Sequence, residues 1–329
     1  MTDVTRLLLK NMVWVVLLVV AGVFIIIEPR VVSVRILLNV LEHSSILGIL
    51  VIGMTFCLLT GRFDLSSEST LGLSALVGAW MVSTNPFFGS GWLLPSWCVI
   101  IVMLLMGLAV GCINSFFILK LRINAFIVTL AMLLALRGFT YVFTNAKTMY
   151  DMPQAFTALG GADLGGIMPA SVVLFLALFG IGHIVLGYTT FGRDLYATGG
   201  NQAAAFAAGI PVGRRTFTAF LVSGVMGALA GWMLAGRLEA VTINLGRGMV
   251  FEVFAAAVIG GVSLSGGKGN MFGPLGGVLL LGVIATGLSV LPISAFWVDA
   301  ARGIVILAAV VLWRVTEIFE EKWRTSPSK

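Results

Sequence analysis

Residues 58–78 read LLTGRFDLSSESTLGLSALVG, and the architecture of the chain can be worked out from the order of residue types in this stretch. An apolar run ends at Leu59, a polar segment rich in Gly and Ser follows, and small and apolar residues then resume. The same order recurs where the apolar run 251–264 leads into VSLSGGKGNMFGPLGG at 262–277. Each stretch predicts a broken helix. A true internal repeat and a chance similarity both remain open.

The composition places this chain in a membrane. Hydrophobic residues make up 59% of its 329 residues, charged residues only 10%, and the mean hydropathy is +1.07, far from the usual range of soluble domains. Non-helical backbone survives at membrane depth only where it lines a cavity or the protein interior. Broken helices at matching places in two halves of a chain are therefore typical of transporters.

Apolar runs between polar breaks predict about ten membrane-spanning helices, because a hydrocarbon core of roughly 30 Å needs about 20 apolar residues per crossing. We expect an all-α polytopic membrane protein in which residues 1–329 form a single transmembrane domain and some helices are broken. The predicted spans are 12–27, 44–60, 69–83, 97–119, 125–143, 170–188, 216–236, 251–264, 272–291 and 299–315.

Ten spans place both termini on one side of the membrane. A cytoplasmic N-terminus leaves 13 of the 20 Lys and Arg residues inside, which agrees with the positive-inside rule. The net charge of +6 then reflects topology and contact with anionic lipid, and not binding of nucleic acid. The thirteen residues are Arg6, Lys10, Arg62, Lys120, Arg122, Arg193, Arg214, Arg215, Lys268, Arg314, Lys322, Arg324 and Lys329.

The first span resembles a signal peptide in its basic start but ends in Glu28-Pro29-Arg30 without a small-x-small cleavage site, so we predict a retained anchor helix. Residues 30–43 follow, with apolar positions at helical spacing beside polar ones. They predict a separate amphipathic helix at the membrane interface.

The cysteines and histidines offer no metal site or disulfide framework. Cys57, Cys98 and Cys112 fall in apolar spans, and only His43 and His183 accompany them, without the spacing of metal ligands. Packing is the expected role of the cysteines, since a buried Cys behaves as a small hydrophobic residue.

Small residues predict close helix contacts, since they let membrane helices approach where no hydrophobic drive exists between them. The chain has 40 glycines. The predicted contact faces contain Gly72, Ser74, Ala75 and Gly78; Gly224, Gly227 and Gly231; and Gly273, Gly276 and Gly277.

The stretch 264–267 reads LSGG, which also opens the signature loop of ATP-binding-cassette ATPases. A phosphate-binding P-loop needs Gly at the place of Val262 and Ser or Thr at the place of Gly269. Neither is present. We therefore expect the chain to hydrolyse no ATP and to bind no cofactor.

The polar loop 189–215 contains the signals of a short helix. Asn201 is a good N-cap, the following residues favour helix, and Gly209 and Pro211 suit its end. A short alanine-rich helix that faces only water is marginal, so a docking partner is favoured. Packing on the chain's own bundle is the alternative.

The loop resembles the Gly-Arg-x-x-Tyr-Ala-x-Gly-Gly-Asn-x-x-Ala-Ala-x-x-x-Gly-Ile loop of the ribose/galactoside/xylose-type permeases of ABC importers. Further segments resemble the same family in the same order: IGMTF and TGRFDLSSES resemble its IGMT and TGGIDLSVGS, INAFIVTLAMLLALRG resembles IPAFIVTLGMLLIARG, and AAAVIGGVSLSGGKGNMFGPLGG resembles AVVLGGTSLAGGKGxxxGTLxG. The matching loop residues are Gly192, Arg193, Tyr196, Ala197, Gly199, Gly200, Asn201, Ala204, Ala205, Gly209 and Ile210.

This resemblance implies a permease subunit in the bacterial inner membrane. Its solute, a monosaccharide, polyol or similar small polar molecule, comes from a periplasmic binding protein. Its partners are a second permease, identical or not, and an ATPase chain that usually carries two fused nucleotide-binding domains and binds ATP and Mg. Loop 189–215 is then the coupling loop that docks on this ATPase.

Departures from the family pattern point to polar residues in the spans. Arg62 stands at a family Gly, and Ser67 and Glu68 replace Val and Gly. Arg62 is expected to reach the inner interface or to form a salt bridge with Glu68. The residues taken as candidates for the solute pathway are Asp64, Ser66, Glu68, Asn114, Arg137 and Glu252.

The carboxylate of Asp64, with Ser66, is expected to accept hydrogen bonds from solute hydroxyls or to cap the helix that begins near Ser67, and the two roles together are favoured. For Asn114 and Arg137 a structural hydrogen-bonding role competes with a place on the pathway. An intramembrane charge is costly, so each of these groups is expected to face the bundle interior.

Two rival functions follow from the same residues. A proton- or sodium-coupled secondary transporter also explains broken helices and the buried Asp64 and Glu252, but it gives the capped loop no role. An intramembrane enzyme is disfavoured, because the two histidines are far apart in the sequence and belong to no Ser-His or His-Glu-x-x-His arrangement.

Overall fold

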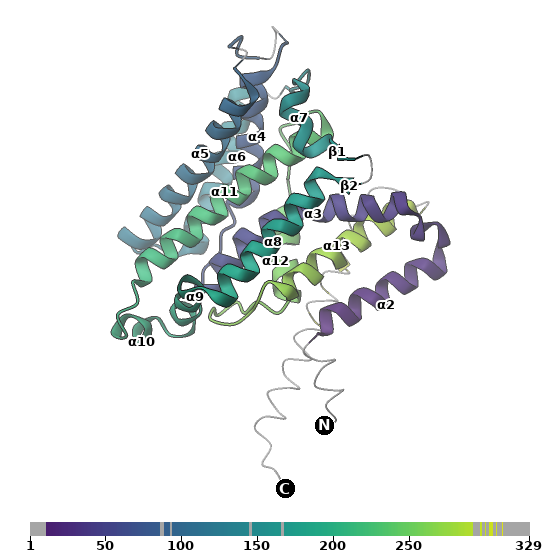
Figure 1. The fold of residues 1–329 in the computed structure, drawn as a ribbon. Helices are drawn as coiled ribbons and strands as arrows, with labels where there is room; N and C mark the ends of the chain where they lie inside the picture. The colour runs from purple at the N-terminus through teal and green to yellow at the C-terminus, as the bar shows by residue number, and fades with distance from the viewer. Residues whose placement is uncertain are drawn as a thin grey trace.

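The computed structural model describes residues 11–291 except 86–88, 93, 145, 146, 166 and 167, together with isolated residues at 297, 300, 303, 304, 307 and 311. Almost all of the described secondary structure is helical (Figure 1). The described strands are the short antiparallel pair β1 (Asp163–Leu164) and β2 (Met168–Pro169). The predicted span 299–315 and the two termini lie largely outside the described residues.

The helices fall in two groups along the chain. The first group ends before the polar loop that follows α6, and comprises α2 (Met12–Ile27), the 3-10 helix η1 (Pro29–Val32), α3 (Val34–Leu59), α4 (Ser67–Val82), α5 (Ser96–Ser115), the π-helical turn η2 (Phe116–Lys120) and α6 (Ala125–Thr144). The second group comprises α7 (Gln154–Gly161), α8 (Ala170–Tyr188), α9 (Thr190–Gly200), α10 (Gln202–Ala207), α11 (Val212–Leu238), α12 (Met249–Ile259) and α13 (Phe272–Val290).

Several described helices are long and apolar enough to cross a membrane, so the all-α polytopic prediction is confirmed. The predicted number of ten spans and the side of the termini stay predictions. The described helices α2 and α12 are apolar but shorter. The 6 long candidates are Val34–Leu59, Ser96–Lys120, Ala125–Phe143, Ala170–Tyr188, Val212–Leu238 and Phe272–Val290.

The predicted separate amphipathic helix at 30–43 is wrong. After η1, the helix α3 runs without interruption from Val34 to Leu59 and includes the predicted second span. Its first turns lack a glycine or proline that would break them, so the apolar spacing of 34–43 continues directly into the buried run that starts at Ser44.

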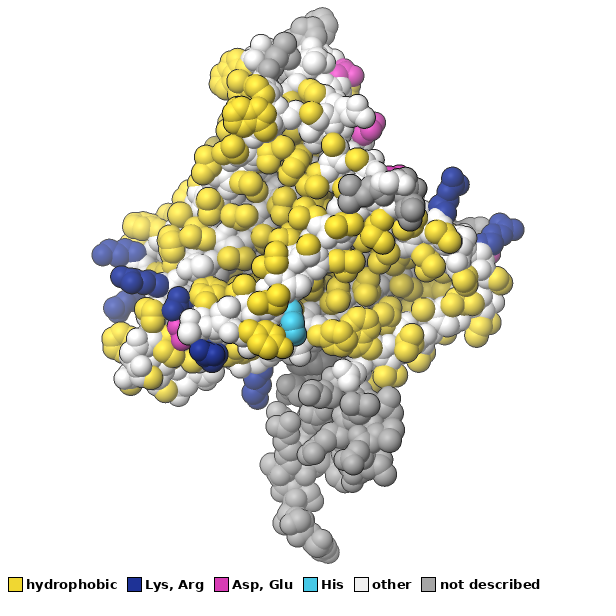
Figure 2. Space-filling model, viewed as in Figure 1, with side chains coloured by type: hydrophobic (Ala, Val, Ile, Leu, Met, Phe, Trp, Pro, Cys, Tyr) yellow, Lys and Arg dark blue, Asp and Glu magenta, His cyan; other side chains and the backbone are white. Residues whose placement is uncertain are grey.

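The helix α11 lies at the centre of the bundle, against α3, α4, α5 and α7 (Figure 1). Its small residues allow this close packing, as predicted. A Cβ at Gly224 would overlap the backbone of Gly107 on α5, and one at Gly231 would overlap the carbonyl oxygen of Leu71 on α4. Hydrophobic side chains cover most of the visible outer face, and Lys and Arg side chains gather at its edges (Figure 2).

Both predicted helix breaks are present, and the two helices before them end in the same way. At the end of α3, Gly61 has φ +75, its N–H donates to Leu58 O (2.8 Å), and Arg62 N–H donates to Cys57 O (3.2 Å). At the end of α12, Gly261 has φ +84 and repeats the pattern with Val258 O (2.8 Å). Both are Schellman caps, which need a left-handed residue. The shared cap supports the repeat hypothesis.

Candidate functional site

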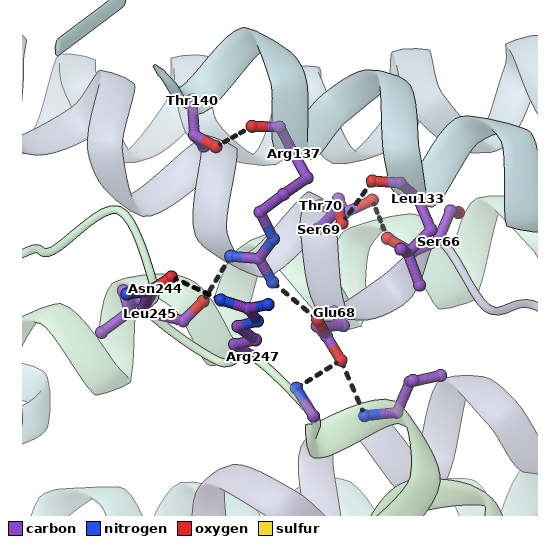
Figure 3. Close-up of polar contacts among 12 residues, drawn as sticks. Ser66, Glu68, Ser69, Thr70, Leu133, Arg137, Thr140, Asn244, Leu245 and Arg247 are labelled. Atoms are coloured by element: carbon purple, nitrogen blue, oxygen red, sulfur yellow. Dashed lines mark hydrogen bonds and ion pairs between the residues drawn. The ribbon is translucent and has the colours of Figure 1, made fainter. Parts of the chain in front are cut away.

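Glu68, in the first turn of α4, is the centre of a buried ion pair (Figure 3). Its Oε1 lies 2.6 Å from Arg137 Nη2 on α6, and only 4% of Glu68 is exposed. Its Oε2 accepts hydrogen bonds from the N–H groups of Gly248 (2.9 Å) and Val250 (3.2 Å). The hypothesis of a local salt bridge from Arg62 to Glu68 is wrong, because both carboxylate oxygens bind groups from other helices.

The guanidinium of Arg137 also fixes the segment before α12. Its Nη1 donates to the carbonyl oxygens of Ile243 and Leu245, both at 3.2 Å. The carboxylate of Glu68 lies at the N-terminus of α12, where the helix dipole favours a negative charge. Because the pair is buried and its remaining hydrogen bonds are satisfied, loss of one partner is expected to cost about 3–5 kcal/mol.

Asp64 and Ser66 form a buried turn that leads into α4. Asp64 Oδ1 accepts hydrogen bonds from Ser66 N–H (3.0 Å) and Ser66 Oγ (2.6 Å), and Asp64 is 1% exposed. Asn114 on α5 donates from Nδ2 to Ser66 Oγ (2.8 Å). Asp64 therefore closes a turn just before α4, whose N-cap residue Ser66 makes no side-chain capping hydrogen bond, and both expected roles of Asp64 stay predictions. Asn114 Oδ1 has no hydrogen-bond partner among the described residues.

Glu252 lies in the first turn of α12 and is half-buried. The preceding residue, Phe251, is 72% exposed. The structure thus brings Glu68 and Arg137 together near the start of α12, and it brings Asp64, Ser66 and Asn114 together at the start of α4. The proposed roles of these residues in solute movement stay predictions.

Asn244 and Arg247, which are exposed on the segment between α11 and α12, were not predicted from the sequence. Arg247 Nη1 donates to Asn244 Oδ1 (3.4 Å), and Figure 3 shows both residues beside Glu68 and Arg137. In the sequence, these two residues belong to a polar stretch between two predicted spans, and such a stretch is typical of an ordinary loop outside the membrane. The contacts of Arg137 that draw this segment inward leave no local trace in the sequence.

The predicted short helix of the polar loop is confirmed as α10. Asn201 caps it, since its Oδ1 accepts a hydrogen bond from Ala204 N–H (3.0 Å). Gly209 follows the helix with φ +81. Ala205 is buried, whereas Ala204 and most of α10 are exposed, and the side chain of Phe206 is 76% exposed. In Figure 1, α10 projects from the corner of the bundle.

The upstream part of the same loop is a second helix, α9, which was not predicted. Thr189 caps it by accepting a hydrogen bond from Gly192 N–H (3.2 Å). Asp194 forms an ion pair with Arg215 at 2.7 Å, which attaches α9 to α11. Arg193 is exposed. Thus α9 is held on the bundle, and α10 extends from it.

The end of α9 meets both helix breaks at a junction of glycines. A Cβ at Gly199 would lie 2.5 Å from Gly267 N and still closer to the carbonyl oxygen of Leu59, whereas one at Gly200 would meet nothing within 4 Å. Gly267 N–H donates to Leu59 O (3.0 Å), and Tyr196 Oη donates to Gly269 O (2.9 Å). The stretch that contains LSGG is thus a backbone connector between α3, α9 and α12.

The long apolar helices, with their two breaks and the projecting capped helix, make a polytopic membrane protein of the all-α class. Residues 36–310 match the family described as the permease component of a branched-chain amino acid transport system, and the chain belongs to this family. This membership supports the permease interpretation over the ion-coupled secondary transporter.

Individual relatives are also permeases. The chain is 34% identical over 313 residues to the ribose import permease protein RbsC of Haemophilus influenzae, with 94% of each chain covered. It is 36% identical over 278 residues to the L-arabinose transport system permease protein AraH of Escherichia coli, covering 82% of this chain and 80% of the relative. It is 32% identical over 311 residues to the galactose/methyl galactoside import permease protein MglC of Escherichia coli, covering 91% and 92%.

Proposed function

We propose that this chain is the pore-forming subunit of an ATP-driven, binding-protein-dependent ABC importer of a monosaccharide, polyol or similar small polar solute. The observation that carries this proposal is the extended similarity to permeases named for ribose, L-arabinose and galactose import. Residues 1–329 act as one permease domain in the bacterial inner membrane, with both termini in the cytoplasm.

The energy for transport comes from a partner ATPase, which docks on the coupling loop 189–215. The partner has two fused nucleotide-binding domains and binds ATP and Mg, and this chain binds neither. The exposure of α10 supports a docking role, because a six-residue helix is marginal without tertiary contacts. The residues assigned to the loop are Gly192, Arg193, Gly199, Gly200, Asn201, Ala204, Ala205 and Gly209.

Solute reaches the pore from a periplasmic binding protein, and the pore forms with a second permease. Alternating access follows from two packings of the same helices, one of which is favoured by ATP and the loaded binding protein. The two helix breaks are suited to this change, since both are attached to α9 at the glycine junction. The pathway candidates are Asp64, Ser66, Glu68, Asn114, Arg137 and Glu252.

Copurification from the native host tests the proposed assembly. The tagged chain, extracted in a mild detergent and identified with its partners by mass spectrometry, is expected to bring down a two-domain ATPase in stoichiometric amount. A second permease sequence would show a heterodimer. Elution of this chain alone would contradict the assembly.

An uptake assay tests the energy source. Uptake of labelled ribose, arabinose and galactose is expected to stop on depletion of ATP and to persist when an uncoupler removes the ion gradients. Replacing Asn201–Gly209 by a Gly/Ser linker is expected to abolish uptake at normal membrane levels. Unchanged uptake by that variant would refute the coupling role of the loop.

A further inference from the structure

The segment between α11 and α12 is not helical, and its middle packs against α6. We call Glu239–Gly248 the re-entrant segment. Arg137 holds it by donating to the carbonyl oxygens of Ile243 and Leu245. Arg137 lies about 10 Å along the axis from the Thr144 end of α6, and helical side chains incline toward the helix N-terminus, which here is deeper.

A second contact fixes the depth from the other side. Glu68, which binds Gly248 N–H, is followed by Ser69, whose Oγ donates to Leu133 O on α6 (2.7 Å). Leu133 lies about 12 Å from the Ala125 end and about 16 Å from the Thr144 end of α6. The Gly248 end of the re-entrant segment therefore lies near the level of the middle of α6, whereas Val241 at its start pairs with Met149 in the loop beyond Thr144.

The re-entrant segment carries exposed polar side chains at this depth. Thr242, Asn244 and Arg247 are all exposed. Lipid cannot satisfy the five donors of a guanidinium or the backbone groups of a non-helical segment, and charged residues within membranes face a bundle interior or a water-filled cavity. This face of the chain is therefore not covered by hydrocarbon.

The opposite behaviour is seen on α8. Most of its exposed residues are apolar, including Leu176, Ile181 and Ile184, which are 45%, 55% and 57% exposed, and His183 is the exposed exception near its Tyr188 end. The outer surface of α8 is therefore mainly apolar, whereas the surface around Arg247 carries Thr242, Asn244 and Arg247 together.

The chemistry of the re-entrant face fits a neutral polyhydroxylated molecule. Arg247 and Asn244 provide hydrogen-bond donors and an acceptor for hydroxyl groups. Phe251, 72% exposed at the start of α12, provides an apolar surface on which the C–H face of a sugar ring can pack. Glu68 already neutralises Arg137 and caps α12, so the N-terminus of α12 is not free to bind an anionic solute.

We propose that Asn244, Arg247 and Phe251 line the water-filled pathway and contact the solute, and that Glu68 and Arg137 are positioning residues that hold the re-entrant segment at membrane depth. This proposal rests on the proposed import of a small polar solute. The present proposal adds the residues that contact the solute, and Asn244, Arg247 and Phe251 were not among the candidates predicted from the sequence.

Thiol labelling tests whether water reaches this face. In a variant with Cys57, Cys98 and Cys112 replaced by Ala, single cysteines are introduced as Asn244→Cys and Arg247→Cys, with Ile181→Cys as the lipid-facing control. A membrane-impermeant methanethiosulfonate reagent applied to the whole transporter in vesicles is expected to modify the first two at least tenfold faster than the control. Equal and slow modification of all three would overturn the proposal.

Uptake by substituted transporters tests solute contact. Arg247→Ala and Phe251→Ala are expected to lower the rate of uptake of ribose, arabinose or galactose at least tenfold. Arg247→Lys and Phe251→Tyr are expected to keep more of it, and copurification of the ATPase should not change. Full uptake by the alanine variants would overturn the contact.

The two levels of failure can be distinguished. A wild-type chain that imports none of these sugars, with Asn244→Cys still labelled, would refute the proposed solute class and leave a water-filled path in place. A wild-type chain that imports one of them with an unlabelled Asn244→Cys would refute the place of the path.

Discussion

Gly199→Ala is predicted to weaken the junction between α9 and the two helix breaks. A Cβ at this position would lie 2.5 Å from Gly267 N and would overlap the carbonyl oxygen of Leu59. These are backbone atoms, so no side-chain rotation relieves the overlap. Overpacking of this kind costs about 1–3 kcal/mol.

Gly200→Ala is the matched control, because a Cβ there meets nothing within 4 Å. Both substitutions replace glycine in the last turn of α9, so both gain similarly, up to about 1 kcal/mol, from the higher helix propensity of alanine. The difference between the two variants therefore isolates the overlap with Leu59 and Gly267.

The first assay is thermal unfolding of the purified chain in detergent. Gly199→Ala is expected to lower the midpoint by about 2–10 °C relative to Gly200→Ala, from the free-energy difference and the usual dependence of Tm on it. The second assay is sugar-dependent ATP hydrolysis by the assembled transporter, which is expected to decrease only in Gly199→Ala. Equal midpoints and equal rates of ATP hydrolysis in the two variants would refute the claim that close contact at Gly199 holds α9 to the two helix breaks.

Three further predictions concern the ion pair and the projecting helix. Glu68→Gln and Arg137→Met are each expected to destabilise the chain by about 3–5 kcal/mol, because each leaves a buried charge unpaired. The double variant is expected to lose less than the sum of the two, since no buried charge is then left unpaired. Denaturant-induced unfolding measures the three losses of stability, and additive losses would contradict the ion pair. Asn201→Ala is expected to lower the stability of α10 by about 1 kcal/mol through loss of its N-cap, whereas Asn201→Asp keeps a capping side chain and is expected to keep that stability. Amide hydrogen exchange over α10 measures the difference, and equal exchange in both variants would contradict the capping role. Phe206→Ala is expected to weaken copurification of the ATPase at least tenfold, as for a buried aromatic anchor of an interface, with Phe217→Ala on α11 as the control; equal loss in both would show a general effect on the fold.

The sequence was sufficient for features that depend on neighbouring residues. Asn201 and Gly209 mark the limits of α10 because caps are local devices, and the breaks at Gly61 and Gly261 follow from the need for a left-handed residue. The packing faces of α11 could also be predicted, since glycines at helical spacing allow close backbone contact whatever the partner helix is.

Features that depend on distant contacts could not be predicted. The partner of Glu68 is 69 residues away along the chain, and Arg62 was the nearest basic residue in the sequence. The extent of α3 was misjudged because amphipathic spacing at an interface and at the exposed start of a long helix look alike. The polar residues Asn244 and Arg247 were missed because their depth is set by Arg137 and not by their own segment.

The ion pair has a consequence for how the chain is inserted during synthesis. Arg137 enters the bilayer within α6, and Glu68 is already there, but the carbonyl group of Ile243 follows 106 residues later. At ordinary elongation rates this interval is about 5–20 s. Of the groups that Arg137 contacts in the folded chain through Nη1 and Nη2, only Glu68 has been synthesised during that time. The carboxylate that caps α12 in the folded chain is therefore available to pair with the guanidinium while α6 is inserted.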